Sequence, residues 1–187
     1  MEYGLIGRTL GHSYSPKIHS LIGGYSYELV SLTEEALDRF LREKNFKGIN
    51  VTIPYKKAVI PYCSSLSSRA KRIGSVNTIV NRGGVLDAYN TDYDGFLYMA
   101  ERAGISFAEG RVAILGSGGT HLTASAVAED MGAADIITVS RRGPVTYEML
   151  RRDYRNCDIL INTTPVGMYP DVTGCPVSLA DFTNLRG

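Results

Sequence analysis

Apolar and polar residues follow two different patterns along this chain, and the pattern changes near Gly104. Before that point, the apolar residues of Thr33–Leu41 recur at the spacing of one helix face, which predicts an amphipathic helix. Gly48–Thr52 begins with apolar residues, as a buried strand does. Ser75–Asn81 and Val85–Tyr89 flank an Arg-Gly-Gly turn and predict a β-hairpin. Hairpins mixed with crossover helices predict a mixed sheet covered by helices.

The second part of the chain repeats strand and helix in a stricter order. Val112–Leu115 is entirely apolar, as in a parallel strand buried on both faces, and a glycine-rich turn and a helix follow it. Two further strands are expected at Asp135–Val139 and Asp158–Ile161, with a helix near Thr146–Tyr154 between them. This βαβαβ order is half of a doubly wound, Rossmann-type nucleotide-binding fold. We therefore expect an α/β protein of two domains, residues 1–105 with the mixed sheet and residues 106–187 with a partial Rossmann-type sheet.

The glycine-rich turn lies between the first strand and the first helix of that second part. It consists of Gly116, Ser117, Gly118, Gly119 and Thr120. Glycine permits a tight turn and close approach of the backbone to a pyrophosphate, and a helix N-terminus offers free N–H groups and positive potential. His121 stands at the last glycine position of the usual dinucleotide pattern, but the strand–turn–helix context still predicts a dinucleotide site.

The end of the next strand distinguishes NADP from NAD. An NAD site places an acid about 20 residues after the glycine turn. This chain instead has Ser140, Arg141 and Arg142. An acid holds the ribose hydroxyls and repels a 2′-phosphate, whereas arginine binds phosphate through its planar fork. The sequence therefore favours NADP, the alternative being that both arginines are solvated loop residues.

The third strand of this part runs into a polar loop, Asn162–Met168. It leaves the sheet at the C-terminal edge, where a nicotinamide ring would lie. Thr163, Thr164 and Met168 are therefore candidates to wall that ring. The alternative is a plain loop that closes on Pro165.

The first part carries its own set of polar residues near the end of a central strand. Asn50 and Thr52 precede Pro54, which ends the strand because proline has no N–H and its ring fixes φ. Lys56 follows that break and can point into a cleft, since strand ends and the loops after them carry the chemistry of α/β folds. The alternative is a solvated lysine beside Lys57.

Four further polar residues of the chain are candidates. Ser13 and Ser15 precede a helix expected to start near Pro16, so both hydroxyls can donate to a carboxylate there, or Ser15 is only an N-cap. Asn77 lies within an apolar strand, where a buried amide needs partners from the protein or from a ligand. Asp92 follows another strand at a helix start, where it either caps the helix or faces the lysine and takes part in chemistry.

Composition narrows the class of protein. With 44% hydrophobic residues, 21% charged residues and a net charge of +1, the chain suits a globular protein without a nucleic-acid or membrane partner. Cys63, Cys157 and Cys175 are an odd number without CxxC spacing, which argues against a disulfide framework and for the cytoplasm. No cluster of histidines and cysteines predicts a metal site, and His12 and His19 are expected to form structural hydrogen bonds. We expect small-molecule ligands and a monomer or homodimer.

Together, six motifs resemble those of one family. They are His12-Ser13-x-Ser15-Pro16-x-x-His19, Asn50-Val51-Thr52-x-Pro54-x-Lys56, Gly74-Ser75-Val76-Asn77-Thr78, Asn90-Thr91-Asp92, Gly116-x-Gly118-Gly119 and Ser140-Arg141. In order and spacing, and across essentially the whole chain, they resemble the motifs of shikimate dehydrogenase. The resemblance implies reversible reduction of 3-dehydroshikimate to shikimate with NADPH, in the biosynthesis of aromatic amino acids.

The resemblance also implies roles for individual residues. Lys56 and Asp92 match the family's catalytic pair. The residues that match its substrate-binding set are Ser13, Ser15, Asn50, Thr52 and Asn77. Gly116–Thr120 matches the pyrophosphate turn, and Ser140–Arg142 matches an Asn-Arg-Thr segment from which its serine and second arginine depart. The 2′-phosphate contact is therefore expected on Arg141, with the share of the second arginine open. We expect the lysine and the carboxylate to meet across a cleft from the glycine turn.

The chain stops at Gly187, whereas the family normally continues with further strands and with helices that return to the substrate domain. We therefore expect a fragment that is weakly active or inactive and inclined to self-associate, since three strands leave an apolar edge uncovered. Two rival functions stay open. One is a dehydrogenase that acts on quinate, and the other is a catalytically silent ligand-binding protein on the same scaffold.

Overall fold

The computed structural model describes residues 1–11 and 13–187, so His12 lies outside the described residues. The chain divides into two compact units, Met1–Thr91 and Asp92–Gly187, which we call the first and the second unit.

The boundary lies one helix earlier than the sequence suggested. Helix α4 (Asp92–Arg102) belongs to the second unit, not to the first. It packs on α5 (Gly119–Asp130), and the hydroxyl of Tyr93 donates a 2.6 Å hydrogen bond to Asp130 Oδ2 between the two helices. The apolar side of α4 is therefore buried against the second unit, which the amphipathic pattern of the helix alone could not specify.

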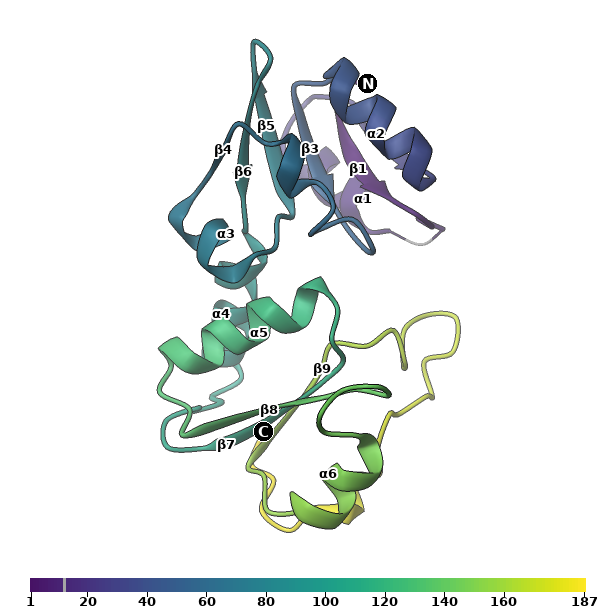
Figure 1. The fold of residues 1–187 in the computed structure, drawn as a ribbon. Coiled ribbons are helices and arrows are strands. Elements are labelled where there is room, and N and C mark those ends of the chain that lie inside the picture. The colour runs from purple at the N-terminus through teal and green to yellow at the C-terminus, as the bar shows by residue number, and fades with distance from the viewer. Residues whose placement is uncertain (12) are drawn as a thin grey trace. The chain divides into compact units, whose positions relative to one another are not determined.

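The first unit is a mixed sheet of six strands with helices around it (Figure 1). Its strands are β1 (Tyr3–Gly7), β2 (Tyr27–Ser31), β3 (Gly48–Val51), β4 (Ser65–Leu66), β5 (Thr78–Arg82) and β6 (Val85–Tyr89). Its helices are α1 (Ser15–Ile22), α2 (Glu34–Glu43), α3 (Ser68–Ile73) and the 3-10 turn η1 (Ile60–Tyr62). In the order β2-β1-β3-β5-β6-β4, the pairs β1–β2, β1–β3 and β4–β6 are parallel and the pairs β3–β5 and β5–β6 are antiparallel. The predicted mixed sheet is confirmed.

Alternation along the strands separates two faces of this sheet. Ile49 and Val51 point to one face and pack with Leu41 of α2 in the hydrophobic core of the unit. Tyr27 and Asn50 point to the opposite face, where α1 contacts β2. Asn50 therefore lies on the face turned away from the core.

The β-hairpin predicted from the Arg-Gly-Gly turn is confirmed. Arg82 pairs with Val85 across a two-residue loop, and the strand before it begins at Thr78 rather than at residue 75. The loop residues Gly83 and Gly84 have φ values of 62° and 93°. Two-residue hairpin loops favour positive φ because it matches the twist of the strands.

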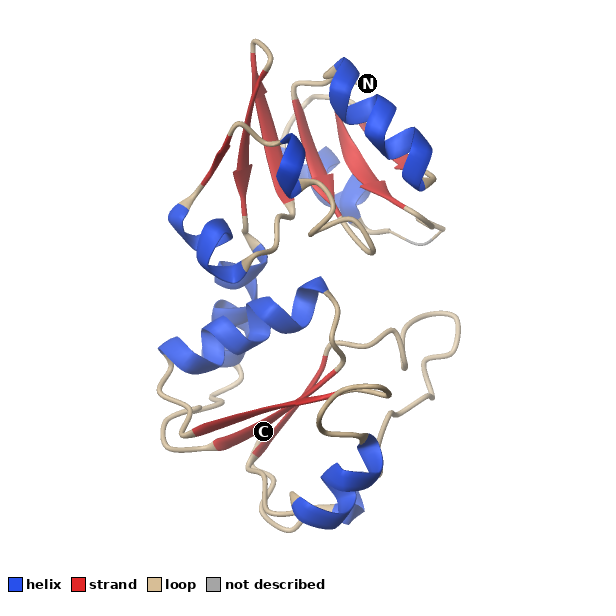
Figure 2. Cartoon of the chain, viewed as in Figure 1, coloured by secondary structure: helices blue, strands red, loops and turns tan. Residues whose placement is uncertain are grey.

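The second unit is a three-stranded parallel sheet flanked by helices (Figure 2). Its strands are β7 (Arg111–Leu115), β8 (Asp135–Val139) and β9 (Ile159–Asn162), in the order β8-β7-β9. Its remaining elements are α6 (Tyr147–Asp153) and the 3-10 turn η2 (Leu179–Asp181). The predicted half of a doubly wound fold is confirmed.

The central strand β7 is buried on both faces, as its apolar sequence predicted. Val112 and Ile114 pack in a core with residues of α4 and α5. Ala113 and Leu115 pack in a separate core with Leu150 of α6. The two cores hold the C-terminal ends of the strands, and the loops that leave them, in fixed positions.

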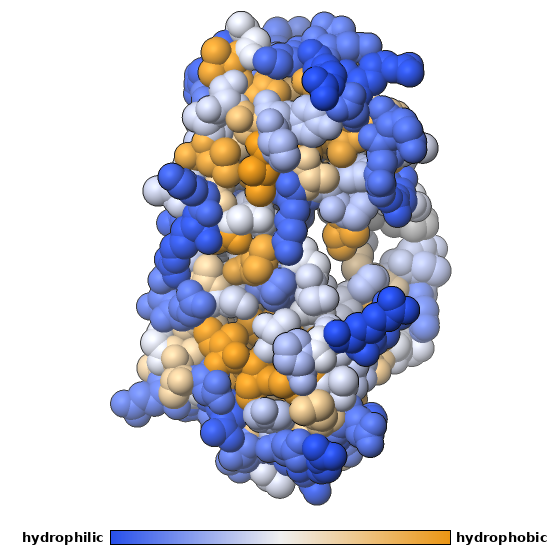
Figure 3. All heavy atoms as spheres, in the orientation of Figure 1, coloured by the Kyte–Doolittle hydropathy of each residue, from blue (hydrophilic) through white to orange (hydrophobic). Residues whose placement is uncertain are grey.

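β9 is an edge strand, and apolar side chains are also exposed at several positions of the surface. Arg186 N–H donates to Asp158 O at 2.8 Å and Leu160 N–H donates to Gly187 O at 3.0 Å, so the last residues pair with part of that edge. Figure 3 shows orange apolar atoms interrupting the hydrophilic surface, and in α1 Leu21 is 81% exposed. Within the part of the chain that the structure describes, no helix is long and apolar enough to cross a membrane.

Candidate active site

The end of β3 and the turn after it position the first group of candidate residues. Asn50 is in β3, and Thr52 follows the strand, where its N–H donates to Ile6 O at 2.9 Å. The Thr52 carbonyl accepts from Tyr55 N–H, also at 2.9 Å. Tyr55 is buried and donates its hydroxyl to Leu32 O at 2.6 Å. These contacts fix the turn that leads to the lysine.

Lys56 is buried, with 9% of its surface exposed. Its carbonyl accepts from Val76 N–H at 2.8 Å, so its backbone is held by the segment that also carries Asn77. Lys57, the next residue, is exposed. The alternative of a solvated loop lysine is therefore wrong for Lys56.

Asn77 is buried, and the protein itself binds its side-chain amide. Nδ2 donates to Thr91 Oγ1 at 2.9 Å, and Oδ1 accepts from Thr91 N–H at 2.8 Å and from Thr78 Oγ1 at 3.2 Å. The buried amide thus has protein partners of the kind that burial requires. Thr91 is the last residue of the first unit and immediately precedes Asp92, so Asn77 also fixes the point at which that unit ends.

Asn50 has a partner that the sequence analysis missed, Tyr27. The Tyr27 hydroxyl donates to Asn50 Oδ1 at 2.7 Å, and Asn50 Nδ2 donates to Thr78 Oγ1 at 3.1 Å and to Asn77 O at 3.3 Å. Burial raises the pKa of Tyr27 to about 12, against a smaller lowering by a hydrogen bond with Ser15. The phenol is therefore protonated at neutral pH and is the donor to Asn50. Nothing in the sequence indicated a contact between Tyr27 in β2 and Asn50 in β3.

The serine turn leads into α1. Ser13 Oγ accepts from Ser15 N–H at 3.2 Å, and α1 begins at Ser15 with Tyr14 as its N-cap residue. The alternative in which Ser15 serves as the N-cap is therefore wrong, and its side chain instead interacts with Tyr27.

His19, one turn further along α1, makes aromatic contacts. Its ring stacks on Tyr27 with the centroids 3.8 Å apart and an angle of 12° between the planes. Its Nδ1 lies 2.7 Å from the hydroxyl of Tyr25. The expectation of a structural role for His19 fits these contacts.

The glycine turn joins β7 to α5. Gly116 has φ of 111°, and a Cβ there would lie 2.7 Å from Thr163 Oγ1, so the turn needs glycine at this position. Gly118 is the N-cap residue of α5, and no atom beyond its chain neighbours lies within 4 Å of a Cβ placed on it. There is thus free space beside the N-terminus of α5, and the first N–H groups of a helix have no partner within the helix itself. Ser117 is exposed and Thr120 is half-buried in the first turn of the helix.

The segment Ser140–Arg142 lies beside this turn. Leu115 is in register with Val139 in the parallel pair β7–β8, and Gly116 N–H donates to Val139 O at 2.8 Å. Arg141 and Arg142 are both exposed, and neither forms an ion pair with a residue that the structure describes. Two cationic side chains therefore follow directly on the strand end that contacts the glycine turn.

The end of β9 reaches the same edge of the sheet. Thr163 donates to Leu115 O twice, from its N–H at 2.9 Å and from its hydroxyl at 2.8 Å. Asn162 Oδ1 accepts from the N–H and the hydroxyl of Thr164 at 3.0 Å and 2.7 Å, which orders the loop that follows. Met168, further along that loop, is 60% exposed. The structure thus brings Thr163 to the glycine turn.

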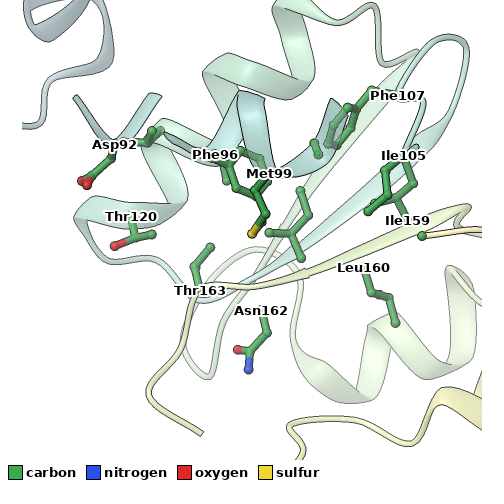
Figure 4. Close-up of a pocket in the computed structure, with 15 residues that line it drawn as sticks. Asp92, Phe96, Met99, Ile105, Phe107, Thr120, Ile159, Leu160, Asn162 and Thr163 are labelled. Atoms are coloured by element: carbon green, nitrogen blue, oxygen red, sulfur yellow. The ribbon is translucent and has the colours of Figure 1, made fainter. Parts of the chain in front are cut away.

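A pocket of about 290 Å³ lies in the second unit between α4, α5 and β9. Figure 4 shows Asp92 and Thr120 at one end of it and Ile105 and Phe107 at the other. Thr163 also lines it, whereas Met168 does not. Asp92 therefore lines the same pocket as two candidate cofactor residues, Thr120 and Thr163, at the rim of a mainly apolar interior.

The two residues expected to form a catalytic pair belong to different units. Lys56 is in the first unit and Asp92 is the first residue of α4 in the second, so their expected meeting stays a prediction. Among the described residues, no group of three or more histidine, cysteine or acidic side chains could hold a metal ion.

Comparison with known proteins finds relatives of nearly the whole chain. Residues 5–79 match the family model described as the shikimate dehydrogenase substrate binding domain. Shikimate dehydrogenase (NADP(+)) of Halothermothrix orenii is 37% identical over 207 residues, which cover 93% of this chain and 71% of that protein.

Solved structures agree with this. Shikimate dehydrogenase 1 from Peptoclostridium difficile superposes with a TM-score of 0.89 at 35% identity, over 99% of this chain and 75% of that one. Shikimate 5-dehydrogenase from Thermus thermophilus, solved in complex with NADP(H) and shikimate, superposes with a TM-score of 0.82 at 29% identity, over 97% of this chain and 75% of that one.

Proposed function

This chain belongs to the shikimate dehydrogenase family, and we propose on that basis that it reduces 3-dehydroshikimate reversibly to shikimate with NADPH. The first unit holds the substrate and the second unit holds the cofactor. One observation carries the proposal: the glycine turn, the arginine pair and Thr163 come together at the C-terminal ends of three parallel strands. That edge of an open α/β sheet is where such folds bind ligands.

The proposed substrate carries one carboxylate and several hydroxyl groups, which need hydrogen-bond partners of both kinds. The side chains that supply them are Ser13, Ser15, Asn50, Thr52 and Asn77. Those of Asn50 and Asn77 are already held by protein hydrogen bonds. A site that pairs polar groups in this way rejects analogues that lack them, because its own buried groups would then be left unpaired.

The residues at the glycine turn fit NADP. The open space at Gly118 admits a pyrophosphate to the first N–H groups of α5, and the exposed guanidinium of Arg141 can bind a 2′-phosphate. Arg142 is equally exposed, so its share is a matter for experiment. NADPH, when bound, supplies the hydride. Thr163 borders the pocket at the place where we put the nicotinamide, with Met168 as an outer contact from the exposed loop.

Lys56 and Asp92 carry the proton chemistry of the proposed reaction. A hydride that reaches the ketone carbon leaves negative charge on its oxygen, and the ammonium of Lys56 stabilises that charge and delivers the proton. The carboxylate of Asp92 orients the lysine and the reacting hydroxyl. In the oxidation direction the same lysine takes the proton back.

The experiment that tests this function is shikimate-dependent reduction of NADP+. The chain is used in excess over shikimate, so that a single turnover is visible even if steady-state turnover is slow. We expect NADPH absorbance to appear only when both ligands are present. Binding of both ligands without any NADPH would favour the catalytically silent protein and overturn the proposed activity.

The choice of acid and cofactor needs the same assay with four ligand pairs. Quinate carries one hydroxyl more than shikimate, and no residue of this chain decides between them. We expect shikimate with NADP+ to give the highest kcat/KM. A higher kcat/KM for quinate would favour a quinate dehydrogenase. A higher kcat/KM with NAD+ would favour NAD as the cofactor.

Two expectations about the chain as a whole stay predictions. Low turnover and self-association are tested by light scattering beside the rate measurement, and a fully active, monodisperse monomer would contradict both. We assign the reaction to the cytoplasm, since Cys63, Cys157 and Cys175 are all free thiols.

A further inference from the structure

Tyr27 connects two of the residues expected to bind substrate. Its hydroxyl donates to Asn50 Oδ1 at 2.7 Å and also interacts with the side chain of Ser15. We propose that Tyr27 is a positioning residue, which orients the Asn50 amide and the Ser15 hydroxyl before the polyol acid binds, while His19 holds the Tyr27 ring in place. This inference rests on the proposed function and deepens it.

The first argument is the orientation of the Asn50 amide. An asparagine ends in one acceptor oxygen and one donor nitrogen, and rotation of the side chain exchanges them. With Tyr27 donating to Oδ1, Nδ2 points at Thr78 Oγ1 and at Asn77 O. The reversed amide would set its oxygen against the carbonyl oxygen of Asn77. Each group in the observed arrangement has a suitable partner, so the network holds one orientation.

The second argument is reach. β1 lies between β2 and β3, with Tyr3 opposite Tyr27 on one side and Leu5 opposite Asn50 on the other. Neighbouring strands lie about 4.8 Å apart, so the backbones of β2 and β3 are separated by roughly twice that distance. A phenol can bridge this gap to an asparagine, whereas a serine or threonine at position 27 is too short. The contact therefore depends on tyrosine in particular.

The third argument is that the Tyr27 ring is itself fixed. His19 stacks on it at a centroid distance of 3.8 Å, and Tyr25 engages His19 Nδ1 at 2.7 Å. α1 has no fully buried residue, so these aromatic contacts are a principal link between α1 and the sheet. Because Ser15 is the first residue of α1, the same link also places Ser15.

Tyr27 acts through Asn50 and Ser15, and this determines the kinetic signature. Loss of its hydroxyl weakens binding of the ground state and of the transition state alike, which raises KM and leaves kcat nearly unchanged. A preorganised polar site gains affinity because its groups need no ordering when the ligand arrives.

The test is Tyr27→Phe, which keeps the ring and its stacking and removes the hydroxyl. Calorimetric titration should show shikimate bound about three- to tenfold more weakly, the effect of one hydrogen bond. The affinity for NADP+ and kcat should stay within about twofold of wild type, because neither depends on the Tyr27 hydroxyl. The matched control is Tyr62→Phe, which removes a 2.7 Å hydrogen bond from a phenol to Asp38 Oδ1 elsewhere in the same unit and should leave shikimate affinity unchanged.

A second pair of variants tests the role of the ring. His19→Ala and His19→Phe both lose the contact with Tyr25, but only the alanine variant loses the stacking on Tyr27. We expect weaker shikimate binding in the alanine variant and recovery in the phenylalanine variant. This pair carries the test if Tyr27→Phe does not fold.

The possible outcomes separate this inference from the proposed function. A wild-type chain that binds no shikimate would overturn the proposed function, and this inference with it. Wild-type binding with an unchanged dissociation constant in Tyr27→Phe would overturn this inference alone. A loss in Tyr62→Phe equal to that in Tyr27→Phe would show a purely structural effect and would also overturn it.

Discussion

The ligand sites proposed for the two units are built in different ways. In the first unit, polar side chains orient one another through a hydrogen-bonded network across the sheet. The network consists of Tyr27, Asn50, Thr78, Asn77 and Thr91. In the second unit, the proposed site is a backbone turn with free space at Gly118, and the charged side chains beside it have no ion-pair partners among the described residues.

The difference follows from what each unit is proposed to bind. A polyol acid offers hydroxyls that must be matched one by one, so its partners need fixed orientations. A pyrophosphate and a 2′-phosphate offer charge and many equivalent oxygens, which backbone N–H groups and exposed arginines can bind without prior ordering. Substitutions in the two units should therefore fail in different ways.

The largest effect is expected from Lys56→Ala. Removal of the group that delivers the proton should lower turnover by about 10² to 10⁴, the range that general acid–base catalysis supplies. The affinity for NADP+ should not change, since that site lies in the other unit. Lys57→Ala, at the exposed neighbouring position, is the control and should turn over normally. Turnover of Lys56→Ala close to that of wild type would remove this residue from its role.

Arg141→Ala tests whether an exposed arginine of the second unit, which forms no ion pair with a described residue, binds the 2′-phosphate. Loss of a charge-assisted bond to the 2′-phosphate should weaken NADP+ binding by about 10- to 100-fold. NAD+ binding should change little, and the preference for NADP+ should fall with it. Arg142→Ala measures the share of the second arginine, and Arg151→Ala, on the exposed side of α6, controls for net charge. Equal losses for NADP+ and NAD+ would contradict a 2′-phosphate contact.

Gly116→Ala and Gly118→Ala separate folding from binding at the glycine turn. At Gly116 the added Cβ would lie 2.7 Å from Thr163 Oγ1 with φ of 111°, so unfolding free energy should fall by about 1–3 kcal/mol. At Gly118 the Cβ meets only open space, so stability should hold while NADP+ affinity drops roughly tenfold. Denaturant unfolding and NADP+ titration check both. Unchanged NADP+ affinity in Gly118→Ala would show that no pyrophosphate approaches this backbone.

The smallest effect is expected at Ser75, an exception within the first unit. Its hydroxyl is fully buried and finds no hydrogen-bond partner in the described part of the chain. Ser75→Ala should therefore leave the unfolding free energy unchanged or raise it by up to about 1 kcal/mol. Ser67→Ala is the contrasting control, because Ser67 Oγ caps α3 and its loss should cost about 1 kcal/mol. A clear loss of stability in Ser75→Ala would reveal a partner for this hydroxyl.

The sequence predicted the candidate site of the second unit better than that of the first. The glycine turn and Ser140–Arg142 were predictable, because parallel strands deliver their C-terminal ends to one edge and local patterns mark those ends. Tyr27 was not, because its contact with Asn50 crosses an intervening strand. Local patterns do not report which side chains meet across a sheet.

Two other differences have local causes. Helix α3 was not predicted, because its six residues are too few for a periodic pattern, although Ser67 and Gly74 mark its two ends. The first unit ends at Thr91, one helix before the expected boundary at residue 105. The amphipathic pattern of α4 does not indicate which unit its apolar side packs against. The contact between Tyr93 and Asp130 shows that it meets α5.

The central claim is that the first unit binds the polyol acid and the second unit binds the cofactor, and amide chemical-shift mapping by NMR tests it most directly. Shikimate and NADP+ are titrated separately into the labelled chain. The account predicts that shikimate shifts resonances around Ser13, Asn50 and Thr78, whereas NADP+ shifts those of Gly116–Thr120 and Ser140–Arg142. Shifts by shikimate centred on the glycine turn, or shifts by NADP+ centred on the first unit, would contradict it.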